Sequence, residues 1–175
     1  MGKRYNLLSF YLILVCLALV LYSLYSIMNN TWLIAPPNYV LLLMSLLTLV
    51  LGAFGFKDKR NWLVKIRSWL TLIVSSLTSI GLLLILLISF LFPNEYIKTI
   101  GPSDNSYSID FYRWDMGAAG TFGILGELNG PLWFKKRIYN EVRTENVKVK
   151  WENNSKVSIN NHILNLNHGD TYGYK

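Results

Sequence analysis

Cysteine is almost absent from this 175-residue sequence, and the single copy, Cys16, lies inside a long apolar run. One cysteine forms no intramolecular disulfide and supplies no thiolate cluster for a metal ion, so disulfide-stapled folds and cysteine-rich zinc sites are excluded. Val15 stands where a bacterial lipoprotein signal has a small residue, which argues against lipidation. We therefore expect Cys16 to serve as a small apolar residue within the run.

Ionisable side chains are absent from three apolar runs, which cover residues 7–28, 39–56 and 68–92. A helix rises about 1.5 Å per residue, so runs of this length can cross a hydrocarbon core of about 30 Å. The first run is longer than the apolar region of a signal peptide and lacks a small-residue cleavage site, which indicates an uncleaved helix. The sequence predicts three transmembrane helices over these runs and a membrane domain over residues 1–92.

The lack of ionisable groups within the runs also argues against a pump or proton relay, because such proteins retain these costly groups for function. Small and hydroxyl-bearing residues recur instead at helical spacing in the second and third runs. Such residues let membrane helices approach closely, so we predict a helix-packing interface, with a substrate path as the alternative. The predicted packing residues are Ser45, Thr48, Gly52, Gly55, Thr71, Ser75 and Ser79.

Negative charge is nearly missing from the first 92 residues, where Asp58 alone stands against seven basic residues. The basic residues form two clusters, one at the N-terminus and one between the second and third runs. Because cytoplasmic loops of membrane proteins are rich in Lys and Arg, we predict a cytoplasmic N-terminus and an extracytoplasmic C-terminal part in the cell membrane. The topogenic residues are Lys3, Arg4, Lys57, Lys59, Arg60, Lys65 and Arg67.

A basic excess is missing from residues 93–175, which contain ten basic and nine acidic residues. Nucleic-acid-binding domains show such an excess, so we expect no nucleic-acid partner. After a polar linker with a turn cluster at residues 101–105, apolar and polar residues alternate as in half-buried strands. Strands are expected at 107–112, 121–128, 133–142, 147–151, 157–159 and 163–166. The predicted fold class is therefore membrane α plus β, with three transmembrane helices followed by a small antiparallel β-domain of five or six strands over residues 93–175.

Glycine recurs every third residue within residues 115–127, a segment that has no proline and no Gly-Lys-Ser/Thr ending. Collagen-like structure and a phosphate-binding loop are therefore excluded. Two interpretations stay open: the glycines permit a turn, a bulge or close backbone approach, or their exposed N–H groups contact a ligand or partner. The candidate residues are Asp115, Gly117, Gly120, Gly123, Gly126 and Glu127.

A basic group, Lys135, Lys136 and Arg137, follows Trp133 closely in the expected third strand. Together these four residues offer a contact for an anionic envelope polymer or for lipid head groups. A solvated strand edge is the alternative, because lysines on edges also prevent aggregation.

The same segments resemble an uncharacterised family of small Gram-positive bacterial membrane proteins with a C-terminal β-domain. The resemblance covers residues 103–174 and departs from the family pattern at Met116 and at Ala119-Gly120. It implies a fold and a location, and it implies no reaction. The matching residues are Gly117-Ala118, Phe122-Gly123, Gly126-Glu127-Leu128, residues 133–139, Trp151 and residues 159–162.

Recognisable catalytic motifs are also absent: there is no Gly-x-Ser-x-Gly, no His-Glu-x-x-His and no usable cysteine nucleophile. The two histidines, His162 and His168, do not fit a known zinc spacing with Asp170, so we expect no metal and no cofactor. We predict a non-enzymatic protein that presents its β-domain for binding at the cell envelope, in a self-protective or accessory role. The partner would be a protein, a peptide or an anionic wall polymer. The alternative is a membrane-anchored hydrolase that uses Asp115 and Glu127 with one of the histidines.

Overall fold

The computed structural model describes residues 2–57, 61–117 and 120–174. Of the residues singled out above, Asp58, Lys59, Arg60, Ala118 and Ala119 lie outside the described residues. The chain divides into two compact units, Met1–Ser23 with Ala35–Ile88 and Leu24–Ile34 with Ser89–Lys175. We call them the helical unit and the β unit, and each is described by itself.

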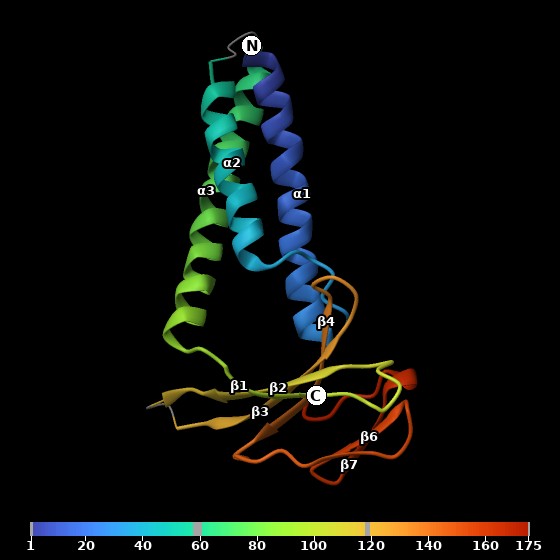
Figure 1. Cartoon of the computed structure of the whole chain (residues 1–175). Coiled ribbons are helices and arrows are strands. Elements are labelled where there is room, and N and C mark those ends of the chain that lie inside the picture. Colours follow the sequence, from blue (N-terminus) through green and yellow to red (C-terminus); the bar gives the residue numbers. More distant parts are fainter. Residues whose placement is uncertain (1, 58–60, 118–119, 175) are drawn as a thin grey trace. The chain divides into compact units, whose positions relative to one another are not determined.

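Three helices account for the predicted apolar runs (Figure 1): α1 spans Gly2–Asn29, α2 spans Asn38–Gly55 and α3 spans Trp62–Leu91. All three are long and apolar enough to cross a membrane, which confirms the predicted membrane part of the fold. Helix α3 begins six residues before the predicted run, because residues 62–67 contain no helix breaker and continue the helix through the basic segment.

Small and hydroxyl-bearing residues lie where α2 and α3 meet in the helical unit. All seven residues of the predicted packing stripe are buried. The Oγ atoms of Ser45 and Ser79 lie 2.9 Å apart, and a Cβ atom added at Gly52 would lie 3.3 Å from the side chain of Thr71. Close packing of this kind, together with hydrogen bonds across the interface, holds helices together in lipid, where the hydrophobic effect between helices is lost.

A buried asparagine that the sequence analysis did not single out joins the starts of α1 and α3. Asn6 is 2% exposed, its Nδ2 donates to Ser68 Oγ and its Oδ1 accepts from Arg67 Nε. A Cβ atom added at Gly55, the last residue of α2, would lie 2.8 Å from the Asn6 backbone. The first turns of α1 and α3 therefore lie side by side, next to the end of α2.

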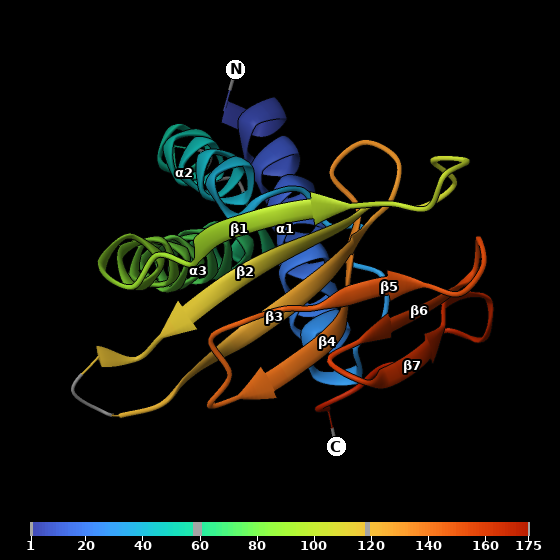
Figure 2. The same cartoon turned by 60° about the horizontal axis from the view of Figure 1, so that its bottom comes forward.

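The β unit contains two antiparallel sheets, and seven strands lie among its described residues (Figure 2). One sheet has the order β1-β2-β3-β4 and the other the order β5-β6-β7. The strands are β1 Glu95–Ile100, β2 Ile109–Asp115, β3 Phe122–Asn129, β4 Lys135–Val142, β5 Val149–Trp151, β6 Lys156–Ile159 and β7 His162–Asn165, followed by a short 3₁₀ helix, η2, at Leu166–His168.

The predicted antiparallel class is confirmed, and the strand count exceeds the expected five or six because β1 occupies part of the segment predicted as a polar linker. This edge strand is largely exposed and carries a register shift between Tyr96 and Lys98, so its residues show no apolar alternation. Its backbone pairing with β2 was therefore invisible in the residue pattern.

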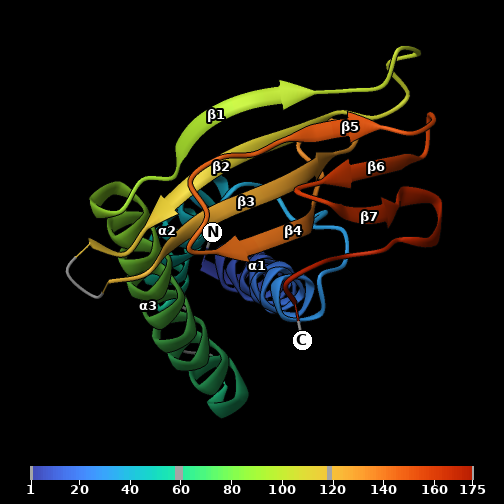
Figure 3. The ribbon, with the colours of Figure 1, turned by 90° about the horizontal axis from the view of Figure 1, so that it is seen from below.

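Both sheets of the β unit (Figure 3) contribute side chains to one apolar core among the described residues. A register shift between Gly126 and Glu127 places two successive β4 residues, Ile138 and Tyr139, in this core. The core residues are Ile109, Phe111, Ile124, Leu128, Ile138, Tyr139, Val147, Val157, Ile159, Leu164 and Leu166.

The segment Leu24–Ile34, which includes the last residues of α1, belongs to the β unit. Leu33 N donates to Lys135 O at 2.7 Å and Lys135 N donates to Leu33 O at 3.4 Å, which makes an isolated antiparallel bridge at the start of β4. Trp133 Nε1 donates to Ile34 O at 2.9 Å. The residues that follow α1 are therefore fixed to β4 and to the turn before it.

Candidate functional site

The four glycines of the candidate segment have two different structural roles. Gly117 and Gly120, in the turn between β2 and β3, have φ angles of 59° and 78°, which favour glycine. Gly123 and Gly126 lie within β3, where an added Cβ would meet Glu141 O at 2.3 Å and the Phe111 ring at 3.2 Å, respectively. Backbone conformation in the turn and close packing within β3 thus favour glycine at these positions.

Three predicted residues, Glu127, Lys135 and Arg137, meet in an ion-pair cluster on one face of the four-stranded sheet. Lys135 Nζ lies 3.2 Å from Glu127 Oε2 and 3.7 Å from Asp110 Oδ2, and Arg137 Nε lies 3.7 Å from Glu127 Oε1. Tyr112 Oη also accepts a hydrogen bond from Lys135. The sequence did not show that Asp110 and Tyr112 lie beside Lys135, because their proximity follows from strand register.

Charges within this cluster compensate one another. Desolvation opposes ionisation of Asp110, but hydrogen bonds from Thr99 and Asn129 and the charge of Lys135 outweigh it and lower the pKa of that carboxyl. Desolvation likewise opposes the charge on Lys135, but its hydrogen bond to Tyr112 and the charge of Glu127 raise its pKa. The adjoining pocket measures about 50 Å³, room for little more than water, so the cluster is better suited to holding the sheet than to binding a ligand.

Lys136 lines a different and larger pocket, which we call the Lys136 pocket. Because successive strand residues point to opposite faces, Lys136 faces away from the ion-pair cluster that contains Lys135. The pocket has a volume of about 400 Å³, within the range typical of ligand sites. Its lining residues are Trp32, Tyr107, Leu128, Lys136, Ile138, Leu166, Asn167, His168, Gly169 and Asp170.

The polar groups of the Lys136 pocket are held from several elements. Lys136 Nζ donates to Gly169 O at 2.9 Å, just after η2. Tyr107 Oη donates to Asn167 Oδ1 at 2.8 Å, and Asp170 Oδ2 accepts from Asn165 N at 2.9 Å. These hydrogen bonds hold the wall of the pocket in place. The ammonium group of Lys136, the hydroxyl of Tyr107 and the amide of Asn167 all line the pocket.

Lys136 differs from its neighbour Lys135 in how its charge is balanced. Among the residues that the structure describes, no carboxylate lies within 4 Å of its ammonium group, and its hydrogen-bond acceptor is a backbone carbonyl. Burial lowers the pKa of Lys136, and the more distant charge of Asp170 only partly opposes this. Lys136 is thus a half-buried cation that shares its pocket with Asp170 but makes no direct ion pair among the described residues. An anion could make that direct contact, which makes this pocket the candidate site.

The groups considered for hydrolysis do not converge. In the β2–β3 register Asp115 pairs with Phe122 at the turn, whereas Glu127 pairs with Asp110 near the other end of the hairpin. Asp115 Oδ1 accepts from Gly117 N, as in an ordinary turn. Asp115 and Arg137 line a further pocket of about 350 Å³ beside Trp114, which contains neither histidine.

The two histidines also lie in different surroundings. His162 stacks on Tyr172 with ring centroids 3.7 Å apart, next to the buried Tyr139, while His168 lines the Lys136 pocket. Within residues 2–57, 61–117 and 120–174, no group of three His, Cys, Asp or Glu residues is placed to hold a metal ion.

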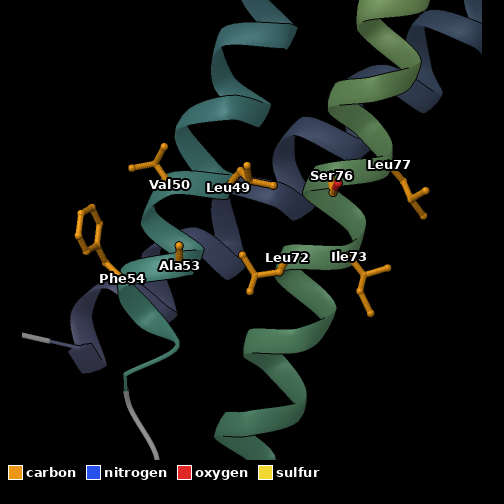
Figure 4. A pocket seen from close by; sticks show the side chains of 8 residues that line it. All are labelled: Leu49, Val50, Ala53, Phe54, Leu72, Ile73, Ser76 and Leu77. Atoms are coloured by element: carbon orange, nitrogen blue, oxygen red, sulfur yellow. The ribbon is translucent and has the colours of Figure 1, made fainter.

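An apolar groove lies between α2 and α3 in the helical unit (Figure 4). Ser76 is the one hydroxyl-bearing residue among those that line it, and the others include Leu49, Phe54, Leu72 and Leu77. Such a surface is expected on helices that face lipid, so the groove does not suggest a polar ligand.

Residues 61–175 match a protein family described as a family of unknown function (DUF5412). The match covers more than half of the chain and includes all of α3 from Trp62 and every strand of the β unit. It confirms the predicted resemblance to an uncharacterised family. No curated protein and no solved structure matches the chain.

Proposed function

The chain belongs to the DUF5412 family, which has no assigned function, and we propose from its own residues that it binds an anionic component of the cell envelope in the Lys136 pocket. The observation that carries this proposal is the contrast between two adjacent lysines. Lys135 is neutralised by Glu127 and Asp110, whereas Lys136 is half-buried beside an open pocket whose one lining carboxylate, Asp170, makes no direct ion pair with it among the described residues. A bound anion would supply the direct contact.

The binding face is the extracytoplasmic side of the membrane in a Gram-positive bacterium. Two basic segments, at the start of α1 and before α3, support this orientation by the positive-inside rule. Asn6 in α1 is hydrogen-bonded to Ser68 and Arg67 of α3, so these helices begin side by side, which supports placing both segments at the same membrane face.

The chemistry of the pocket favours a small phosphate ester that also carries hydroxyl groups. Lys136 offers a charge-assisted bond to the phosphate, and Asn167, His168 and Asp170 offer partners for hydroxyls. Trp32 and Tyr107 give the pocket aromatic walls. Phosphorylated polyols occur both in lipid head groups and in anionic wall polymers, and both would present this chemistry.

Binding without catalysis is the function that this geometry supports best. The carboxylates proposed for hydrolysis, Asp115 and Glu127, lie near opposite ends of the β2–β3 hairpin. A general acid and a general base that act in one reaction must both reach the reacting atoms of the substrate. Asp115 and Glu127 do not meet this requirement, because they lie near different ends of the hairpin. The role is thus that of a membrane-anchored receptor or accessory protein.

The experiment is a calorimetric titration of the full chain, in nanodiscs of phosphatidylcholine, with glycerol 3-phosphate. We expect binding with a Kd of about 1 mM or tighter. Lys136→Met keeps the aliphatic stem and removes the charge, and it should weaken binding about 10- to 100-fold, the effect of losing one charge-assisted hydrogen bond. Lys150→Met, at an exposed position of β5, makes the same change in net charge and should leave binding unaltered.

The second arm separates the two sources of the phosphate. Nanodiscs that contain phosphatidylglycerol should abolish the heat of glycerol 3-phosphate binding if the head group occupies the pocket, and should leave it if a wall polymer is the ligand. Equal affinities of wild type and Lys136→Met, or no binding at all, would refute the proposed function.

A further inference from the structure

We propose that the turn between β3 and β4 is inserted into the head-group region of the bilayer. The contact is made by four residues of the β unit, Trp32, Ile34, Leu132 and Trp133, which we call the interfacial tip. This membrane contact is separate from the Lys136 pocket in its evidence and in its test.

Leu132 has an unusual backbone conformation for an exposed leucine. Its φ angle is 60°, in the left-handed region that a bulky side chain rarely adopts, and its side chain is 82% exposed. Such a backbone costs about 1–2 kcal/mol for an L-residue. Leu132 gains no burial within the chain in return, so a contact outside the chain explains why a leucine is held there.

The tip joins two segments far apart in sequence. A Cβ atom added at Gly130 would lie 2.7 Å from the Trp32 ring, and the indole N–H of Trp133 donates to Ile34 O at 2.9 Å. Ile34 and Trp133 nevertheless remain 47% and 44% exposed. The packing thus aligns apolar side chains from both segments without covering them.

Ile34 is only a few residues along the chain from two candidate membrane-spanning helices. Ile34 lies between the end of α1 at Asn29 and the start of α2 at Asn38, both of which are candidate membrane-spanning helices. Four residues of extended chain reach about 14 Å at most, so Ile34 stays close to the bilayer surface, and Trp133 is bonded to it.

The composition of the two segments that form the tip is typical of a membrane interface. Residues 29–38 and 129–134 contain no charged side chain but contain two tryptophans and a phenylalanine. Tryptophan is enriched at the level of lipid head groups, where its ring meets the apolar side and its N–H finds a polar partner. A lipid surface therefore fits the tip better than a polar protein partner does.

The test uses the full chain with Cys16→Ser, which removes the single native thiol. Cysteine is introduced by Leu132→Cys, and by Ile163→Cys as the matched control, because Ile163 is an apolar β7 residue that is 59% exposed. Each variant is labelled with an environment-sensitive fluorophore and reconstituted into vesicles of phosphatidylcholine and phosphatidylglycerol at low protein content. Lipids with a nitroxide on the head group or at the top of the acyl chain serve as quenchers.

The label at residue 132 should emit at shorter wavelength and be quenched about twofold more strongly by the nitroxide lipids than the label at residue 163. Pro131→Cys, at an exposed neighbouring position, provides a second probe if the change at Leu132 disturbs folding. Equal quenching at both sites would overturn the proposal. A blue shift that depends on protein concentration and is insensitive to the quenchers would overturn it too, because another copy of the chain would then cover the tip.

Discussion

Replacing Gly123 with alanine should destabilise the β unit much more than the same change at Gly117, although both glycines belong to one repeating segment. At Gly123 the added Cβ would lie 2.3 Å from Glu141 O and 2.8 Å from the Trp114 ring. The carbonyl belongs to β4, so β3 and β4 would have to separate. At Gly117 nothing lies within 4 Å of the added Cβ, and the penalty comes only from the φ angle of 59°.

The magnitudes follow from these two environments. Overpacking costs about 1–3 kcal/mol, and a lost ladder hydrogen bond costs about 1 kcal/mol. The lower conformational entropy of unfolded alanine returns about 0.5–1 kcal/mol. Gly123→Ala should therefore cost about 1–3.5 kcal/mol. For Gly117→Ala, about 1–2 kcal/mol of left-handed strain is offset by the same return, which leaves about 0–1.5 kcal/mol.

The assay is urea unfolding of the full chain in detergent micelles, followed by tryptophan fluorescence. Trp114 lies against Gly123 and reports on the strand pair directly. From the centres of these ranges, Gly123→Ala should lower the free energy of unfolding by about 1.5 kcal/mol more than Gly117→Ala. Equal costs, or a larger cost at Gly117, would refute the assignment of the two glycines to steric and conformational roles and would favour an unrecognised contact at the turn.

Two further changes test other parts of the structure. Gly55→Ala should lower the stability of the helical unit, because its Cβ would lie 2.8 Å from the Asn6 backbone. Gly81→Ala meets nothing within 4 Å and should be neutral or stabilising by up to about 1 kcal/mol. Thermal unfolding in micelles compares the two variants, and equal melting temperatures would contradict the packing of Gly55 against Asn6. Because the pKa of Asp110 is lowered in the folded chain, its stabilising contribution is complete above the ordinary value of 3.8 and is lost as pH falls through the folded value. Asp110→Asn should flatten the loss of unfolding free energy below about pH 4, and an unchanged acid slope would show that the pairing with Lys135 does not stabilise the sheet.

Sequence patterns were sufficient for the membrane part, because each signal there is local. Uninterrupted apolar runs define α1, α2 and α3, and the spacing of small residues coincides with the buried contact between Ser45 and Ser79. The role of Asn6 was not foreseeable, since it depends on which helix ends meet in space.

The β unit shows where sequence reasoning stops. Alternation of polar and apolar residues located β2 to β7 approximately, yet β1 is an exposed edge strand whose pairing depends on its backbone. The bridge between Leu33 and Lys135 joins segments about a hundred residues apart and leaves no local pattern. Lys135 and Lys136 are equivalent in sequence, and only the strand faces separate an ion-paired residue from the candidate site.

We expect the β unit to lie outside the cell and the basic segment at the start of α3 to lie inside. Substituted-cysteine labelling can measure this orientation, because Cys16 is fully buried and Cys16→Ser gives a thiol-free chain. Ser103→Cys, in the exposed β1–β2 connection, and Asn61→Cys, just before α3, are treated in intact cells with a membrane-impermeant maleimide. With this topology we expect labelling at residue 103 in intact cells and at residue 61 only after permeabilisation. Labelling at 61 but not at 103 in intact cells would contradict it, because the Lys136 pocket would then face the cytoplasm.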